Sequence, residues 1–497
     1  MKHPISRRNF LRTAAVSGIL FSTSRSPLLM AEEARGANEK VNVAVVGVRG
    51  RGGDHINGFL GVKDVAMTYI VDVDDPVGKS RCDFLEEKQG FRPKMVRDLR
   101  DALSDPQLDA VSIATPNHWH SLMAIWAMRA GKDVFVEKPA CQNLFEGRVM
   151  VTAVEKYRRI CQVGTQCRSN SGVRDAIRFI QEGGIGEVNL ARGLCYKRRK
   201  SIGPLGDYPV PGSVDFNLWS GPAIYTEPKV TRQSFHYDWH WQRLYGNGDS
   251  GNQGPHQADI ARWGLGLMRL PNKITTYGGR LGYQTERNDP NYVDAGDTPN
   301  TEVSILDYGD KTMIFETRGL ETSALDNAAV GVIFYGTEGK LVQESYTRSV
   351  AYDKNGNKIR EFGGGGDHLH YGNFIECVKS GKSEDLNAPA IDGYLSAGVA
   401  ILGNISYYVG EENRRSADAI RKSLESVDNR DDNAATLART VEHLQANGVD
   451  LDKTPLSLGP ELIFDAETER FTNCDAANRE LTRQWREGFE CPSKNEV

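Results

Sequence analysis

The feature that most constrains this chain is a short β-branched run that leads directly into a glycine-rich turn. Val41–Val46 has the length and composition of a buried parallel strand. Gly47-Val48-Arg49-Gly50-Arg51-Gly52 follows at once, and a helix-like segment continues to Leu60. In such a turn the first glycine permits a tight bend, and the last lets the helix pack closely on the strand. The backbone N–H groups at the helix start can then hold a pyrophosphate.

A carboxylate lies at the distance that this kind of turn requires. Asp72 ends the next apolar strand, Ala66–Val71, 20 residues after Gly52. It can accept hydrogen bonds from a ribose 2′-hydroxyl and repels a 2′-phosphate, so we expect NAD rather than NADP. Asp74 is the alternative for this role, and the two arginines of the turn weakly favour a phosphate. The turn residues expected to bind the cofactor are Gly47, Arg49, Gly50, Arg51 and Gly52, together with Asp72.

Further strands and helices alternate along residues 77–163. The apolar runs predict strands at 109–114, 133–136 and 160–163, with helices at 77–89, 117–130 and 143–157 between them. This alternation at βαβ spacing predicts an α/β fold with a Rossmann-type, doubly wound parallel sheet.

Composition excludes several classes of protein. The net charge of the 497-residue chain is −5, so no basic excess favours nucleic acid or anionic lipid. No run of about 20 apolar residues predicts a membrane span. The eight cysteines are scattered singly without zinc spacing, so we expect buried or free thiols and no metal site, with disulfides possible if the protein is exported.

The first residues resemble an export signal. Ser6-Arg7-Arg8-Asn9-Phe10-Leu11-Arg12 is a twin-arginine pattern, and weakly apolar residues follow at 13–21 and 27–31. We therefore expect residues 1–37 to be a leader for the twin-arginine (Tat) pathway, cleaved after Ala31 or Ala37, and the protein to be periplasmic. Because this route carries folded proteins, it suits a protein that acquires a cofactor in the cytoplasm.

Two further motifs complete a family resemblance. Ala114-Thr115-Pro116-Asn117-His118-Trp119-His120 closes one strand, and Val136-Glu137-Lys138-Pro139 closes the next. With the glycine turn and Asp72, they resemble the Gfo/Idh/MocA oxidoreductase family. The leader and the segment at 246–256 look like a secreted bacterial branch of that family.

The resemblance implies a domain plan. It gives an NAD-binding Rossmann domain at 38–165, a substrate and oligomerisation domain at 166–411, and an extension at 412–497 with one clear helix at 434–446. The second domain would be α/β with a large, mostly antiparallel sheet, and the protein a homo-oligomer, dimer or tetramer. Strand-like stretches at 187–196, 273–281, 302–308, 311–317, 329–335 and 340–344 fit this plan, as do helix-like stretches at 373–379 and 394–409. The glycines at 363–366 predict a flexible loop.

Lys138 is the first candidate for chemistry. It follows a strand, at the end where ligands bind to such sheets. A lysine there can polarise or deprotonate an alcohol if its pKa is lowered. The resemblance implies that Glu137 and Lys138 border the nicotinamide, that Lys138 contacts the reacting hydroxyl, and that Thr115, Asn117 and His120 also hold the cofactor.

His256 is the second candidate. In the family an Asp-x-x-x-His pair often supplies the proton acceptor, but Asn252 replaces the aspartate here. Asparagine can orient a hydroxyl but cannot take its proton, so the burden falls on His256 and Lys138. Asp259 lies three residues further on the same helical face and could orient the imidazole.

Substrate-binding candidates come from two sources. Residues 235–241 gather four aromatic side chains, of the kind that stack on pyranose rings, although a core strand is the alternative. By family position, Lys197 and Arg168 are the cations expected to face the substrate. The rest of the basic cluster at 197–200 is interpreted as a solvated loop. The substrate residues expected are Arg168, Lys197, Tyr237, Trp241, Asn252 and His256.

These features predict an NAD(P)-dependent oxidoreductase acting on a CHOH group of a sugar, cyclitol or glycoside. Because export separates the protein from the free cofactor pool, NAD would stay bound and be recycled. One alternative is a redox-neutral glycoside hydrolase or lyase that acts through transient oxidation at C3. Another is a non-catalytic sugar-binding protein, against which the intact Lys138 and glycine turn argue.

Overall fold

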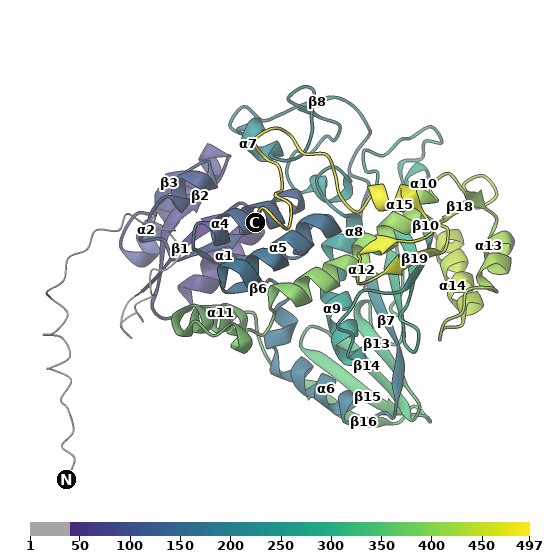
Figure 1. The fold of residues 1–497 in the computed structure, drawn as a ribbon. Helices are drawn as coiled ribbons and strands as arrows, with labels where there is room; N and C mark the ends of the chain where they lie inside the picture. The colour runs from purple at the N-terminus through teal and green to yellow at the C-terminus, as the bar shows by residue number, and fades with distance from the viewer. Residues whose placement is uncertain (1–39) are drawn as a thin grey trace, which may run out of the picture. The chain divides into compact units, whose positions relative to one another are not determined.

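Six parallel strands form the N-terminal sheet, which confirms the predicted doubly wound arrangement. The computed structural model describes residues 40–497, one compact unit (Figure 1); the expected leader, residues 1–37, lies outside the described residues. The strand order is β3-β2-β1-β4-β5-β6. The strands are β1 (Val41–Val46), β2 (Val65–Val71), β3 (Lys94–Val96), β4 (Ala110–Ile113), β5 (Asp133–Val136) and β6 (Cys161–Val163).

Helices cover both faces of this sheet because its strands are apolar on both sides. On β1, Val43 and Val45 face one layer and Ala44 and Val46 the other, as the two-residue period of a strand requires. One layer holds α3 (Leu99–Leu103), α4 (His120–Arg129) and α5 (Leu144–Tyr157). The other holds α1 (Arg51–Leu60), α2 (Asp75–Gln89) and α11 (His368–Ser380). Helix α11 lies far along the chain but packs in this layer, so the residues before the expected domain boundary at 165 do not form the layer alone.

The second sheet is large, mixed and mostly antiparallel, as expected. Its main path runs β16-β15-β14-β13-β7-β12-β11-β10-β18-β17, and β7 pairs with β12 in parallel. The predicted strands appear as β7 (Val188–Tyr196), β10 (Lys273–Gly279), β11 (Thr301–Asp307), β12 (Thr312–Arg318), β13 (Val330–Gly336) and β14 (Gly339–Ser345). Two further strands, β15 (Arg348–Asp353) and the edge strand β16 (Lys358–Gly363), were not predicted; β16 is almost wholly exposed and lacks an apolar pattern.

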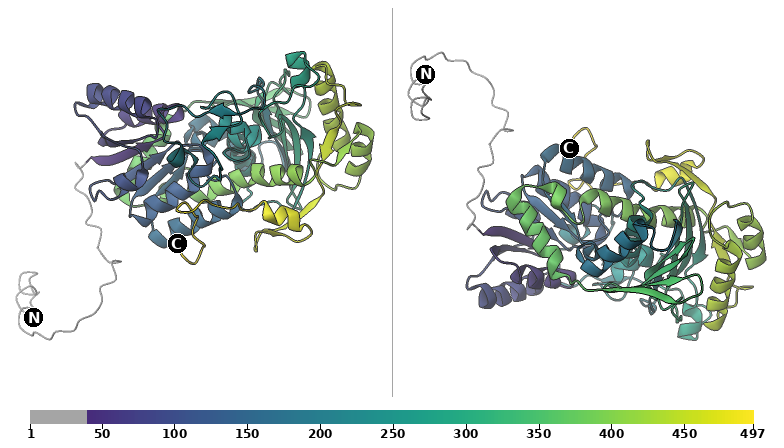
Figure 2. Two further views of the ribbon diagram at one scale, coloured as in Figure 1. Left: turned by 90° about the horizontal axis from the view of Figure 1, so that it is seen from above. Right: turned by 90° about the horizontal axis from the view of Figure 1, so that it is seen from below.

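Helix α12 (Ala390–Val409) joins the two sheets. It packs against β6 and α5 on one side, and against β10 and α9 (Gly254–Leu265) on the other. Seen from above and below, α12 runs between the two sheets (Figure 2). Its sequence is apolar all round, which is the pattern of a helix buried on every side.

The residues after 411 do not form a separate layer. Strands β17 (Arg414–Arg415), β18 (Leu456–Leu458) and β19 (Leu462–Asp465) extend the second sheet, and β20 (Arg470–Phe471) pairs with β19. Helices α13 (Ala417–Leu424) and α14 (Asn433–Ala446) cover its face, and α14 matches the predicted helix. The last residues turn back to the first domain, where the Phe489 ring lies 5.5 Å from that of Trp119.

The described residues bear on two expectations, which concern membrane-spanning helices and the cysteines. None of the helices in residues 40–497 has the length and hydropathy needed to span a bilayer. All eight cysteines are free thiols, and all except Cys474 are buried.

The buried carboxyl group of Glu302 on β11 allows a pH-dependent prediction. Burial raises the pKa of Glu302 from its ordinary 4.5 to about 7. Because the unfolded chain releases this proton first, the contribution of Glu302 to stability falls as the pH rises between these two values. We therefore expect Glu302→Gln to increase the free energy of unfolding at about pH 8 by on the order of 3 kcal/mol, with little change near pH 4.5. Urea unfolding at both pH values tests this; an equal change at both would refute a titration effect.

Candidate active site

The predicted motifs meet at the carboxyl edge of the first sheet. Strands β1, β4 and β5 are neighbours, so the turns that follow them lie side by side. Gly47 has φ +76°, a conformation that side chains rarely adopt, and a Cβ there would lie 2.9 Å from the Ala114 carbonyl oxygen. A Cβ on Gly52 would lie 2.1 Å from the Gly47 carbonyl oxygen. Both glycines are therefore required for the close approach of α1 to the strands.

The same turn fits the pyrophosphate of a dinucleotide. A Cβ on Gly50 would meet no atom within 4 Å, so open space lies beside the residue at which α1 begins. No side chain caps the first turn of α1. The Oγ1 of Thr115 and the Oδ1 of Asn117 are buried without a hydrogen-bond partner in the described residues. Because buried polar atoms are normally paired, these atoms fit a polar ligand held at this edge.

Asp72 lies at the end of β2, beside the turn. Its carboxylate accepts hydrogen bonds from the backbone N–H groups of Val48, at 2.8 Å, and Asp74, at 2.9 Å. Burial raises the pKa of Asp72 to about 6, which leaves it mostly charged at neutral pH. The carboxylate thus also fixes the turn. Asp74, the alternative, lies 3.7 Å from Arg49 and 3.4 Å from His236.

We expect Asp72→Ala to weaken NAD binding by about ten- to hundredfold and to reduce discrimination against NADP. A hydrogen bond to a charged group contributes about 1.5–3 kcal/mol, which corresponds to a loss of this size. Titration of both cofactors into the variant measures it, with Asp74→Ala as the matched control. A loss seen only in Asp74→Ala would transfer the role to Asp74.

The buried carboxylate of Glu137 pairs with the partly exposed guanidinium of Arg51. The Arg51 Nε donates to Glu137 at 2.7 Å, and the buried His55 ring lies 3.1 Å from the same carboxylate oxygen. Burial alone would raise the pKa of Glu137, but Arg51 and His55 outweigh it and hold that pKa well below its usual range. This pairing ties the glycine turn to the residue before Lys138. The contacts of Arg51 and Glu137 with the cofactor stay predictions.

Lys138 reaches across from the first domain to α8 (Gly248–Asn252) in the second. Its Nζ donates to the Asn252 backbone carbonyl at 2.8 Å and lies 3.4 Å from the Asn252 side-chain oxygen. Burial lowers the pKa of Lys138, and Arg51, Lys197 and Arg199 act in the same direction. A lysine amine of lowered pKa beside an amide is suited to receive a proton from an alcohol.

His256 lies in the first turn of α9, which is buried along nearly its whole length. Burial, with Lys138 adding to it, lowers the pKa of His256 to about 3, so the imidazole is neutral. Its Nδ1 is buried without a hydrogen-bond partner in residues 40–497, and its ring lies 5.1 Å from that of Tyr346. A neutral imidazole can orient a hydroxyl, but this pKa makes it a weaker proton acceptor than Lys138.

His120 does not have a free ring nitrogen. Its Nδ1 lies 2.6 Å from the Pro139 carbonyl oxygen, and its Nε2 lies 2.8 Å from the Thr115 carbonyl oxygen. The ring thus links the two motif turns. We correct the expectation for His120 accordingly, because both of its ring nitrogens contact backbone carbonyl groups. The side-chain oxygens of Thr115 and Asn117, in contrast, are unpaired in the described residues.

Asp259 and Arg168 bind each other, which corrects two expectations. Arg168 donates through Nε and Nη2 to Asp259, at 2.7 and 2.8 Å, and through Nη1 to Asp392 at 2.8 Å. Ser396 Oγ donates to Asp259 as well. Asp259 therefore holds Arg168 rather than His256, and every side-chain nitrogen of Arg168 already donates to a carboxylate. The group is buried between α9 and α12.

The remaining substrate candidates lie around the aromatic segment. Residues 235–241 form a turn and a short 3₁₀ helix instead of a strand, and Tyr237 is exposed whereas Trp241 is buried. Lys197 is exposed, and its Nζ lies 3.5 Å from the Gln253 side-chain oxygen. Arg199, which sequence analysis assigned to a solvated loop, binds Asp249 at 2.9 Å.

Several residues that organise this site were not predicted from the sequence. His55, Asp249 and Asp392 are all buried partners of the charges described above. The lone carboxylate of Asp392 in an otherwise apolar helix was a usable signal, because a buried charge implies a partner. The sequence positions of His55 and Asp249 gave no signal that these residues would pair with other charged groups.

Comparison with known proteins assigns the first domain. Residues 41–165 match the Gfo/Idh/MocA model, an oxidoreductase family with an NAD-binding Rossmann fold. Residues 41–165 are therefore similar to the NAD-binding domain of that family. The similarity covers the glycine turn and the fit to a dinucleotide, and it supports NAD as the cofactor.

Two curated relatives and one solved structure extend the comparison. A glycosyl hydrolase family 109 protein of Saccharopolyspora erythraea is 31% identical over 209 residues, which cover 38% of this chain and 46% of the relative. The NAD⁺-dependent scyllo-inositol 2-dehydrogenase of Bacillus subtilis is 36% identical over 31% of this chain and 44% of its own length. The matches thus span less than half of these relatives. A levoglucosan dehydrogenase, solved with NADH and levoglucosan, shares the fold, with a TM-score of 0.53, 19% identity and coverage of 73% of this chain and 95% of its own.

Proposed function

We propose that this protein is an NAD-dependent oxidoreductase that acts on a CHOH group of a sugar, cyclitol or glycoside. The observation that carries the proposal is the placement of Lys138. Lys138 follows β5 at the carboxyl edge of the NAD-binding sheet, and its amine donates a hydrogen bond to Asn252 of the second domain. Burial lowers the pKa of this amine. The names of the scyllo-inositol and levoglucosan dehydrogenases support a polyhydroxylated substrate.

Several residues act on the same substrate hydroxyl group, each in a different role. When bound, NAD would accept the hydride from the carbon that bears this hydroxyl. Lys138 receives the hydroxyl proton, which its lowered pKa favours. Asn252 and the neutral imidazole of His256 orient the hydroxyl, and the Arg51–Glu137 pair keeps Lys138 in place.

A redox-neutral glycoside cleavage is the second candidate. It is favoured by the matches to glycosyl hydrolase family 109 proteins. The same Lys138 would serve, because transient oxidation at C3 of the sugar acidifies the C2 proton and allows a glycosidic substituent to leave. A non-catalytic sugar-binding role does not need a buried lysine of lowered pKa at this position.

Purified protein tests these functions directly. Denaturation and mass spectrometry identify any retained nucleotide, and a panel of sugars, cyclitols and glycosides is then added while the absorbance of reduced nicotinamide is followed. A dehydrogenase should accumulate reduced cofactor and an oxidised sugar. Release of an aglycone without net reduction would select the redox-neutral reaction. Absence of both with every compound would contradict an enzyme of either kind.

We also propose export through the Tat pathway to the periplasm, with cofactor bound before export and recycled afterwards. The support is the twin-arginine pattern at 6–12. A double variant, Arg7→Lys with Arg8→Lys, should stay in the cytoplasm with its leader uncut, which fractionation and mass measurement detect. Normal processing of that variant would contradict the proposal. The expected homo-oligomer, a dimer or tetramer, belongs to the same proposal and is measured by light scattering.

A further inference from the structure

A recess near α8 has a lining that does not include Lys138, and it plays no part in the chemistry above. It has a volume of about 450 Å³ and lies between the segment after β7 and the aromatic segment 235–241. Four basic side chains line it, from residues 198–200 and Arg287, and Tyr237 and Trp241 form an aromatic wall. We call it the basic pocket.

Part of the positive charge in the basic pocket is not neutralised. Arg198 pairs with Glu286 and Glu321, and Arg199 pairs with Asp249. Lys200 and Arg287, in contrast, have no acidic group within 4 Å among residues 40–497. The lining contains a single carboxylate, Asp238, and burial raises the pKa of Asp238 to about 6. The balance of charge around the pocket therefore favours an anion.

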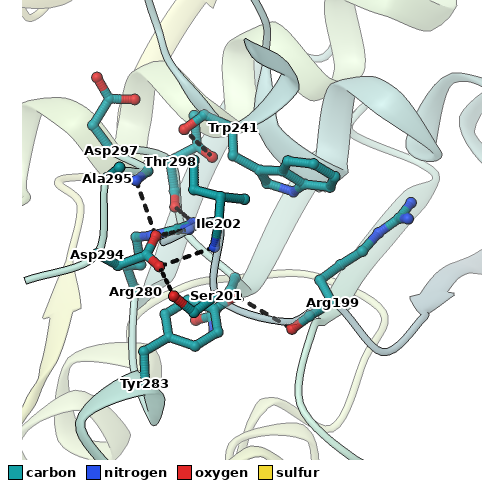
Figure 3. Close-up of polar contacts among 12 residues, drawn as sticks. Arg199, Ser201, Ile202, Trp241, Arg280, Tyr283, Asp294, Ala295, Asp297 and Thr298 are labelled. Carbon is teal, nitrogen blue, oxygen red and sulfur yellow. Dashed lines mark hydrogen bonds and ion pairs between the residues drawn. The ribbon is translucent and has the colours of Figure 1, made fainter. Parts of the chain in front are cut away.

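The wall of the pocket is held in a fixed shape. Asp294 accepts hydrogen bonds from the Ile202 backbone N–H at 3.1 Å, from Arg280 Nε at 2.8 Å and from the Ser201 hydroxyl (Figure 3). These contacts fix the backbone that carries Lys200. A preorganised cation site loses less entropy when it binds an anion than a mobile loop does.

The aromatic wall suits a sugar ring. Tyr237 has φ +69°, an unfavourable conformation for a non-glycine residue, and the residue is 54% exposed. Its ring lies 5.6 Å from that of Trp241. The Arg199 guanidinium lies 5.2 Å from the Trp241 ring, and Figure 3 shows both of these side chains. A strained backbone at Tyr237 holds a large aromatic ring in solvent at the edge of a pocket. This arrangement is typical of a side chain that contacts a ligand.

One short helix connects the basic pocket with Lys138. On α8, Asp249 binds Arg199 of the pocket and Asn252 binds Lys138. Three residues of helix span about 4.5 Å. Arg199 of the pocket and Lys138 are therefore both anchored to α8, on residues three positions apart.

We propose that the basic pocket binds an anionic substituent, a carboxylate or a sulfate, and that acidic sugars are the substrate class. The inference rests on the proposed function. Lys200 and Arg287 attract the anionic group, and Tyr237 and Trp241 contact the ring that bears it.

Calorimetric titration of the full chain with matched sugars tests this inference. The pairs are glucuronate with glucose and galacturonate with galactose, and glucose 6-sulfate is added to distinguish sulfate from carboxylate. We expect at least one acidic sugar to bind ten or more times more tightly than its neutral counterpart. Equal affinities in every pair, or no binding by any member, would overturn the inference.

Variants assign the preference to the pocket. Lys200→Ala with Arg287→Ala should abolish the preference for the acidic sugar, and Asp238→Asn should increase it at about pH 7. Lys354→Ala with Lys358→Ala, two exposed lysines on the β15–β16 hairpin, is the matched control and should leave it unchanged. A preference that survives the loss of Lys200 and Arg287 would overturn the assignment.

The test also separates this inference from the proposed function. Lys138→Ala should retain the preference for acidic sugars even where turnover is lost. Selective binding of acidic sugars without cofactor reduction or cleavage in the unmodified protein would refute the proposed function alone. Turnover of neutral sugars without such selectivity would refute the inference alone.

Discussion

Replacing Lys138 with alanine should slow turnover by about 10²–10⁴-fold, the usual contribution of general acid–base catalysis, while NAD stays bound. Both candidate reactions begin with loss of hydride from a CHOH group whose proton must be received, and Lys138 is the buried amine placed to receive it. Single-turnover reduction of the bound cofactor, followed by absorbance, isolates this step from product release.

Two controls make the Lys138 result interpretable. Lys156→Ala removes an exposed lysine of α5 and should have no effect on turnover. His256→Ala should lose less activity than Lys138→Ala, because burial lowers the pKa of His256 to about 3 and leaves it an orienting group. Unchanged cofactor reduction in Lys138→Ala would remove Lys138 from the chemistry and make the Glu-Lys-Pro motif structural.

Asp259→Ala should destabilise the protein by about 3–5 kcal/mol, the typical cost of removing one partner from a buried ion pair. Asp259 accepts two hydrogen bonds from Arg168, and its loss would leave that guanidinium held by Asp392 alone among the described carboxylates within hydrogen-bond distance. Urea or thermal unfolding measures the change.

The Asp259 variant also distinguishes a structural role from the orienting role that sequence analysis suggested. Asp418→Ala, which removes a carboxylate that is 91% exposed, is the matched control and should change stability little. If Asp259 acted on His256, Asp259→Ala would lower turnover at unchanged stability, and that outcome would reject the buried-pair explanation.

Local sequence predicted five of the six strands of the first sheet, whereas the short β3 and the packing of α11 on one face appeared only in the structure. The β-branched run of Val41–Val46, the glycine turn and Asp72 predicted β1, the start of α1 and the carboxylate that closes the turn. These features are encoded within a few residues, because strand composition, backbone freedom at glycine and the length of a βα unit are all short-range properties. The same reasoning located Lys138 at the end of β5.

Tertiary structure alone decided which charges meet. Helical spacing correctly placed Asp259 and His256 on one helix, but it carries no information on what lies opposite that helix. Arg168 fills that place from 91 residues away, and Asp392 joins it from α12. In the same way, Asp249 on α8 turns Arg199 of the basic cluster into part of a pocket wall. A buried charge binds the nearest opposite charge that packing provides, and packing of segments far apart in sequence is fixed only when the whole chain folds.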